Sequence, residues 1–129
     1  MIKQQFHIEH YWKVIVYYSL DYDLFSIVET DLKAAGATKR MIDRIHYSLR
    51  HNAKAVTFSN YNEHISIVLF NPHKNILDYI SSLVHEAEHV KQAMLHVYDV
   101  EDMGEPPAYT VGYIAMKMYD VFQKLLKIS

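Results

Sequence analysis

The stretch that decides the fold is residues 75–98, NILDYISSLVHEAEHVKQAMLHVY. Its apolar residues return every three or four positions, which is the spacing of one face of an α-helix. That stripe consists of Ile76, Ile80, Leu83, Ala87, Val90, Met94 and Val97. The opposite side carries the polar residues Asp78, Ser81, His85, His89, Gln92 and His96. The stretch therefore predicts a helix of about six turns with an apolar back and a polar front.

The segments on either side of this helix predict its neighbours. Residues 107–128 carry a second apolar stripe, which predicts a long C-terminal helix packed beside the first. Ahead of the helix, residues 55–59 and 64–70 are rich in strand-forming residues. They are separated by residues 60–63, Asn-Tyr-Asn-Glu, so a hairpin is expected.

The N-terminal part predicts one strand and two helices. Residues 12–20 are rich in Val, Ile and Tyr and stop at turn-prone residues 21–23, which is typical of a strand. Residues 24–35 and 38–51 have helical spacing and are separated at Gly36. The expected order is β-α-α-β-β-α-α, an α+β domain.

Composition limits the class of protein. With 129 residues, half of them hydrophobic, the chain suits a single domain over residues 1–129. The formal net charge is -2 and no segment carries a Lys/Arg stripe, so neither nucleic acid nor a membrane is an expected partner. The first ten residues lack the pattern of a signal peptide, which favours a cytoplasmic protein.

His85-Glu86-Ala87-Glu88-His89 is the motif that carries chemistry. Residues four apart on a helix differ by only about 40° and about 6 Å of rise, so both imidazoles can reach one ion. Because the chain has no cysteine, a metal site must use His, Asp or Glu. The pattern therefore predicts one zinc ion on His85 and His89, with Glu86 as the general base that activates water.

Two histidines leave a tetrahedral zinc site short of a protein ligand. The loop after residue 98 offers Glu101, Asp102 and Glu105, and His96 is a further candidate on the polar face. His96 is about 10 Å along the axis from His89, so we expect it at the surface or behind the ligands. Pro106 disfavours helical geometry at Glu105, which places that residue just ahead of the last helix.

The motif followed by Gly104-Glu105-x-x-Ala108-Tyr109 resembles the gluzincin group of metallopeptidases. More narrowly, it resembles small zincin-like proteins carried by bacterial phages and mobile elements. The resemblance in motifs covers residues 84–113, and the order of elements ahead of it is loosely similar to a minimal zincin domain. It implies Glu105 as the third zinc ligand, with His85, His89 and Glu86 in the family's ligand and base roles.

Tyr109 is a candidate donor to a developing oxyanion. It follows Glu105 by four residues and would face the same way on a helix, although a tyrosine that only packs is the alternative. The expected function is a zinc-dependent metallopeptidase that hydrolyses a peptide or protein substrate lying along the edge of the hairpin. The alternative is a non-catalytic binding or regulatory protein on a zincin scaffold.

Overall fold

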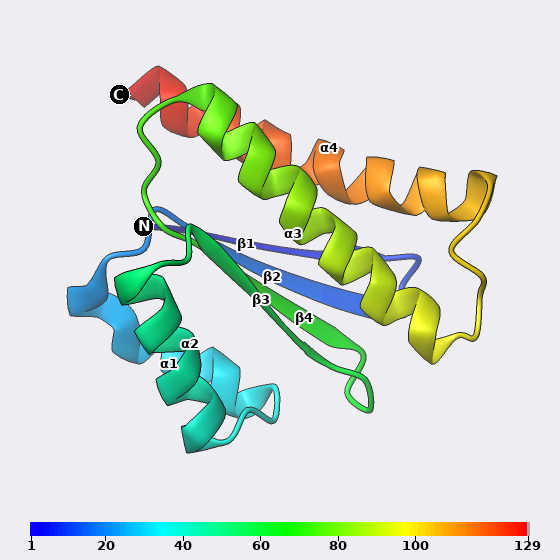
Figure 1. The fold of residues 1–129 in the computed structure, drawn as a ribbon, viewed down its shortest axis with the longest axis horizontal. Coiled ribbons are helices and arrows are strands. Elements are labelled where there is room, and N and C mark those ends of the chain that lie inside the picture. Colours follow the sequence, from blue (N-terminus) through cyan, green and yellow to red (C-terminus); the bar gives the residue numbers. More distant parts are fainter. Residues whose placement is uncertain (129) are drawn as a thin grey trace.

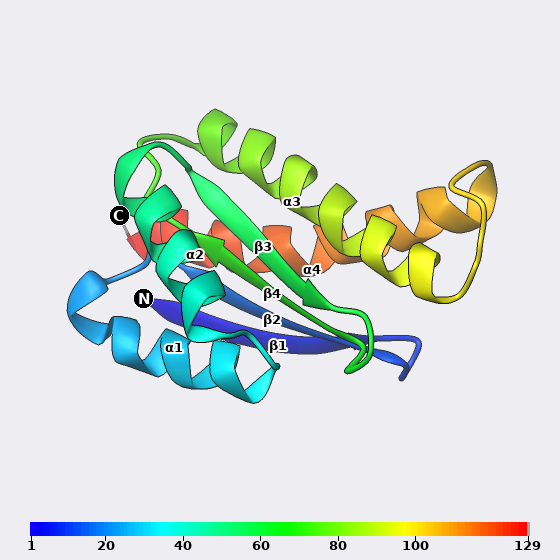
Figure 2. The same cartoon turned by 60° about the horizontal axis from the view of Figure 1, so that its bottom comes forward.

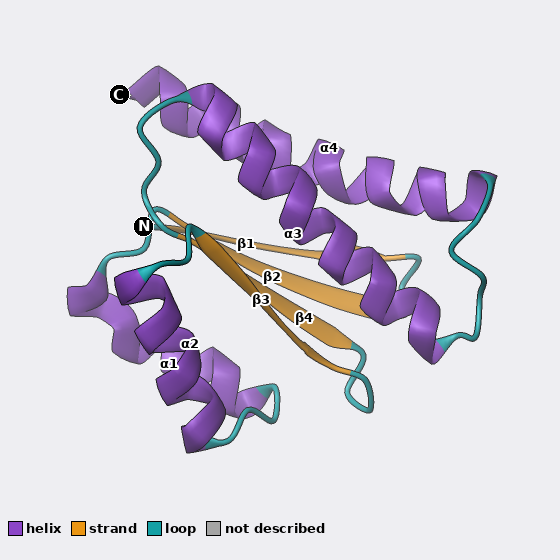
Figure 3. Cartoon of the chain, in the orientation of Figure 1, coloured by secondary structure: helices purple, strands orange, loops and turns teal. Residues whose placement is uncertain are grey.

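The computed structural model describes residues 1–128 and has the α+β class expected from the sequence (Figure 3). In chain order, the elements are β1 (Ile2–Ile8), β2 (Trp12–Tyr18), the short 3-10 helix η1 (Tyr22–Leu24), α1 (Phe25–Ala34), α2 (Lys39–His51), β3 (Ala55–Asn60), β4 (Ile65–Phe70), α3 (Ile76–Val97) and α4 (Glu105–Ile128). None of the helices among the described residues is long and apolar enough to cross a membrane.

The strands form one sheet in the order β1-β2-β4-β3. The two central strands, β2 and β4, are parallel, and each edge strand is antiparallel to its central neighbour. Parallel central strands are usually covered on both faces, which explains why Ile65–Phe70 is a continuous run of buried residues. The predicted hairpin is confirmed as β3 and β4, and β3 lies at a free edge of this sheet.

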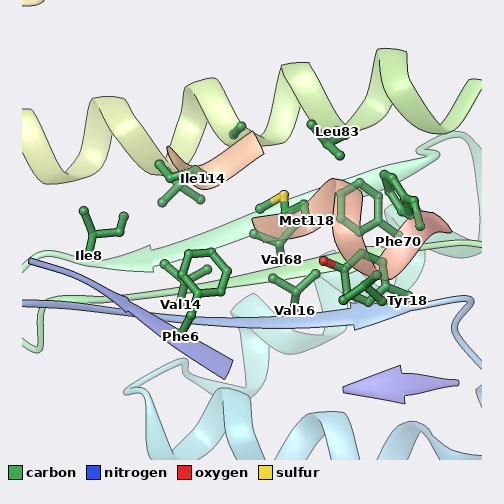
Figure 4. Packing of buried hydrophobic residues seen from close by; sticks show 14 of the residues in the cluster. Phe6, Ile8, Val14, Val16, Tyr18, Val68, Phe70, Leu83, Ile114 and Met118 are labelled. Atoms are coloured by element: carbon green, nitrogen blue, oxygen red, sulfur yellow. The ribbon is translucent and has the colours of Figure 1, made fainter. Parts of the chain in front are cut away.

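Helices cover both faces of the sheet (Figures 1 and 2). Alternate residues of β2 point to opposite faces, as strand geometry requires. Val14, Val16 and Tyr18 pack with α3 and α4 (Figure 4). Ile15 and Tyr17 pack with α1 and α2 on the other face. The sheet is therefore shared by two hydrophobic cores.

The predicted order of elements is wrong in one respect, because it lacks β1. Residues Ile2–Ile8 alternate between exposed and less exposed side chains, and only Phe6 and Ile8 are buried. Half of the strand is polar, so its sequence carries little apolar signal. Its pairing with β2 and the packing of Phe6 against Tyr113 of α4 decide its structure, and both are contacts distant in sequence.

The predicted long helices are confirmed, and α4 packs beside α3 (Figure 1). The Asn75 side chain caps α3 by accepting a hydrogen bond from the backbone N–H of Asp78, 3.0 Å away. The expectation that Glu105 lies ahead of the last helix is wrong, because α4 begins at Glu105. Pro106 and Pro107 lie in the first turn of α4. Backbone N–H groups there have no partner within the helix, so a proline costs no helical hydrogen bond.

Candidate metal centre

His85 and His89 converge on the polar side of α3. Their Nε2 atoms are 3.2 Å apart, and both rings are exposed. Two nitrogen ligands at 2.0–2.1 Å from a tetrahedral zinc would be separated by about 3.3 Å. The same spacing permits an N–H···N hydrogen bond between the rings when no metal is bound. The donor atoms are thus already placed at the separation that one zinc ion requires.

Glu86, next in the chain, has a different environment. Its side chain is only 4% exposed and points toward β3. Thr57 of β3 donates its hydroxyl hydrogen bond to Glu86 Oε1 at 3.1 Å, and Glu86 Oε2 lies 3.9 Å from His85 Nε2. Burial raises the pKa of Glu86, while the Thr57 hydrogen bond and the two histidines act in the opposite direction. A carboxylate of increased basicity therefore sits beside the histidine pair.

The pair lies in a groove between the edge strand β3 and α3, which run side by side (Figure 2). One hollow of about 420 Å³ is lined by Thr57, Ser59, Tyr61, His89, Gln92, Ala93 and His96. A second hollow of about 250 Å³ is lined by Lys54, Ala55, Ser81, Ser82, His85 and Glu86. The hydrogen bond between Thr57 and Glu86 lies at their boundary, because Thr57 lines the first hollow and Glu86 the second. We call them together the β3–α3 groove.

Glu105 and Tyr109 lie elsewhere. Glu105 is exposed at the first residue of α4. Within residues 1–128, no group of three or more His, Asp and Glu side chains is arranged to hold a metal ion. Tyr109 is 73% exposed and lines a separate hollow with Tyr113 and residues 7–10, next to the turn between β1 and β2. The structure brings together His85, His89 and Glu86, but it does not bring Glu105 or Tyr109 to them.

The other candidate ligands have different partners. Asp102 pairs at 2.7 Å with Lys91, whose amine also contacts Glu88 at 2.6 Å. Lys91 is buried; although burial lowers its pKa, these carboxylates raise it by more, so the lysine stays charged. His96 packs against Tyr61 and lines the groove two turns beyond His89. Asp102 thus fastens the loop after α3, and His96 belongs to the wall of the groove.

Two features of this site were not expected from the sequence, namely the role of Thr57 and the burial of Glu86. The second could have been found, since Glu86 lies about 20° from Tyr79 on a helical wheel, inside the arc that packs on the sheet. Thr57 gives no such signal, because its role depends on which strand lies against α3. No family model matches the chain, no curated protein matches it, and no solved structure matches it.

Proposed function

We propose that the chain is a zincin-like, zinc-dependent metallopeptidase that binds one zinc ion through His85 and His89. The observation that carries this proposal is the 3.2 Å separation of the two Nε2 atoms beside the buried carboxylate of Glu86. A solvated helix face would not require a buried glutamate with its own hydrogen-bond donor. The arrangement instead has the parts of a hydrolytic site, namely a metal-binding pair and a base.

When bound, zinc would lower the pKa of a water molecule and polarise the substrate carbonyl. Glu86 would accept a proton from a water molecule beside the histidine pair, and its burial makes it a stronger base than an exposed glutamate. Thr57 holds Oε1 of Glu86, which leaves Oε2 on the side of His85. The protein thus fixes the base by contacts that do not depend on the metal.

The groove favours an extended peptide as the substrate. The outer side of β3 pairs with no other strand of the described chain, so its backbone groups are available to a peptide that adds to the sheet. A peptide bound in this way passes Thr57 and therefore the histidine pair. A strand that adds to β3 must offer backbone N–H and C=O groups, which a peptide has. This supports a peptide as the substrate.

For the third protein ligand we keep Glu105, on the strength of the motif resemblance alone. Its position at the start of α4 follows a loop that Asp102 fastens to Lys91. The proposal for Glu105 is therefore separate from the proposal for the histidine pair, and each can fail without the other.

The test is zinc analysis and peptidase assay of the wild type and of Glu86→Gln. We expect about one zinc per chain in both proteins, and hydrolysis only in the wild type, because the amide cannot accept a proton. Glu88→Gln is the matched control on the same helix, and it should keep zinc and turnover. Less than half an equivalent of zinc in the reconstituted wild type would refute the metal site. Zinc without turnover would favour a non-catalytic binding protein.

A further inference from the structure

A larger hollow adjoins the β3–α3 groove at the start of β3. Its volume is about 700 Å³, and it lies between the end of α2, the residues after β4 and the first turn of α3. Charged side chains in its wall are Arg50, Lys54, Lys74 and Asp78. Lys54 also lines the hollow that contains His85 and Glu86. The two spaces are therefore neighbours.

This hollow is positively charged. Three cations and one carboxylate give its wall a net charge of two positive charges. Lys54 pairs loosely with Asp78 at 3.6 Å, and in residues 1–128 neither Arg50 nor Lys74 forms a salt bridge. His73, also in the wall, adds no charge near neutral pH because burial lowers its pKa below 6.5.

Arg50 is held in position for a ligand. Its guanidinium lies over the ring of Tyr22, 4.7 Å from the centroid. The Tyr22 hydroxyl in turn donates a hydrogen bond to Asn71, which donates to the carbonyls of Leu49 and Ala53. A guanidinium stacked on an aromatic ring keeps its N–H edge free, and that edge fits a carboxylate with two parallel hydrogen bonds.

The direction of β3 tells which part of a bound peptide reaches this hollow. Lys54 directly precedes β3, whereas Thr57, beside Glu86, is three residues further on. A peptide that adds antiparallel to β3, the more stable pairing, has its C-terminal part at the Lys54 end. Three residues of strand span about 10 Å, so that end lies about three residues beyond the bond next to Glu86.

We propose that this hollow is a subsite for a carboxylate located about three residues after the scissile bond. The carboxylate can belong to an acidic side chain or to the end of the peptide. This inference rests on the proposed peptidase function, because that function defines the path of the substrate through the β3–α3 groove. It adds a substrate preference to that function. Peptides with an acidic residue about three positions after the scissile bond, or with their C-terminus there, should be preferred.

The experiment compares three versions of one peptide with zinc-loaded protein. One has Glu at the third position after the cleaved bond and an amidated C-terminus, one has Gln there with the same amide, and one ends there with a free carboxylate. Hydrolysis of the first and third should exceed that of the second by about tenfold in kcat/KM. A gain in only one of them identifies the source of the carboxylate.

Arg50→Gln should remove this preference, so that the three peptides are hydrolysed with similar kcat/KM, because only a carboxylate uses the guanidinium. Arg44→Gln, on another exposed part of α2, is the matched control and should keep the preference. Equal hydrolysis of all three peptides by the wild type would overturn the subsite while leaving the peptidase intact. If no peptide is cleaved, the peptidase fails. Fluorescence anisotropy with the same peptides then decides the subsite, which is overturned if Arg50→Gln binds them as tightly as the wild type does.

Discussion

Neighbouring residues of one helix turn have opposite environments in this protein, and the proposed chemistry depends on that contrast. The side chain of His85 is 71% exposed, whereas that of Glu86 is only 4% exposed. Consecutive residues of a helix are rotated by about 100°, so His85 points into the groove while Glu86 points toward Thr57 of β3. A metal ligand must be reachable, and a base gains strength from burial, so the two positions suit their proposed roles.

Thr57→Val should keep the base at Glu86 but reduce its ionised fraction at low pH. The Thr57 hydrogen bond lowers the pKa of Glu86, so its loss should raise that pKa further above 4.5. A base works only when ionised, and the acid limb of the pH–rate profile should therefore move to higher pH. Thr57→Ser keeps the hydroxyl and should retain the wild-type profile. An unmoved acid limb in Thr57→Val, measured as kcat/KM against pH, would exclude Thr57 from this role.

At the residue scale, the sequence predicts groups that belong to one helix and misses those that depend on packing between elements. His85 and His89 follow from a spacing of four. Thr57 and the pairing of Lys91 with Asp102 join segments that the sequence does not show to be neighbours. Tyr109 shows that a correctly predicted helix is not enough. It lies on the expected C-terminal helix, but it lines a different hollow from the histidine pair.

At the scale of elements, the third ligand can be tested by alanine substitutions after α3. Glu105→Ala is expected to weaken zinc binding more than Glu101→Ala, Asp102→Ala or His96→Ala, as the motif resemblance implies. Asp102→Ala should instead lower the free energy of unfolding by about 1 to 2 kcal/mol, because it breaks the pair with buried Lys91. Zinc titration and urea unfolding separate the two effects. If Asp102→Ala or Glu101→Ala loses more zinc affinity than Glu105→Ala, then Glu105 is not the third ligand.

The connection from β4 to α3 should make stability depend on pH. His73 Nδ1 lies 2.6 Å from the carbonyl oxygen of Asn71, which it can meet only as a donor, so Nε2 accepts from the Ser82 hydroxyl at 2.7 Å. Burial lowers the pKa of His73, so below pH 6.5 the unfolded chain binds a proton that the folded chain resists. Its contribution to stability is complete above that pH and declines as pH falls through the lowered pKa.

His73→Gln is the variant that isolates this effect. Urea unfolding at pH 7.5 and at successively lower pH should show that the wild type loses more stability than His73→Gln does. His51→Gln, an exposed histidine of α2, is the control and should follow the wild type. Parallel pH dependence in the wild type and in His73→Gln would show that His73 is not responsible.

Elements differ in how well the sequence predicts them, for a physical reason. The amphipathic pattern of α3 and the apolar run of β4 reflect burial against the sheet or within it, so each is visible locally. β1 is half exposed and is held by β2 and by Tyr113, whose hydroxyl donates to the carbonyl of His7. Such a strand is specified by its partners rather than by its own residues.

At the scale of the whole molecule, the sheet separates the proposed site from half of the hydrophobic core. The β3–α3 groove lies on the side of α3 and α4, whereas α1 and α2 pack on the opposite face (Figure 1). The hollow with Arg50 is the place where α2 reaches the groove. Thus α2 contributes to both: Ile42 and Leu49 are buried against the sheet, and Arg50 lines the hollow next to the groove.

Because one sheet carries both cores, the two layers should unfold together. Leu32 of α1 is fully buried in the core opposite the groove, so Leu32→Ala should lower the free energy of unfolding by about 2 to 5 kcal/mol. Trp12, the only tryptophan, is buried in the core on the side of α3 and α4 and reports on that layer. Its fluorescence and the far-UV circular dichroism should show one coincident transition, shifted together in the variant.

Ile27→Ala is the matched control for Leu32→Ala, because Ile27 is 49% exposed on the same helix and its truncation should cost less than about 0.5 kcal/mol. The opposite result would be two separate midpoints in Leu32→Ala, with part of the circular dichroism signal lost at lower urea concentration and the midpoint of Trp12 fluorescence unchanged. It would mean that α1 and α2 form an independent layer. Coincident midpoints carry a consequence for the site. A substitution far from the groove would then remove zinc binding only through global unfolding, so zinc affinity of Leu32→Ala measured well below its transition should equal that of the wild type.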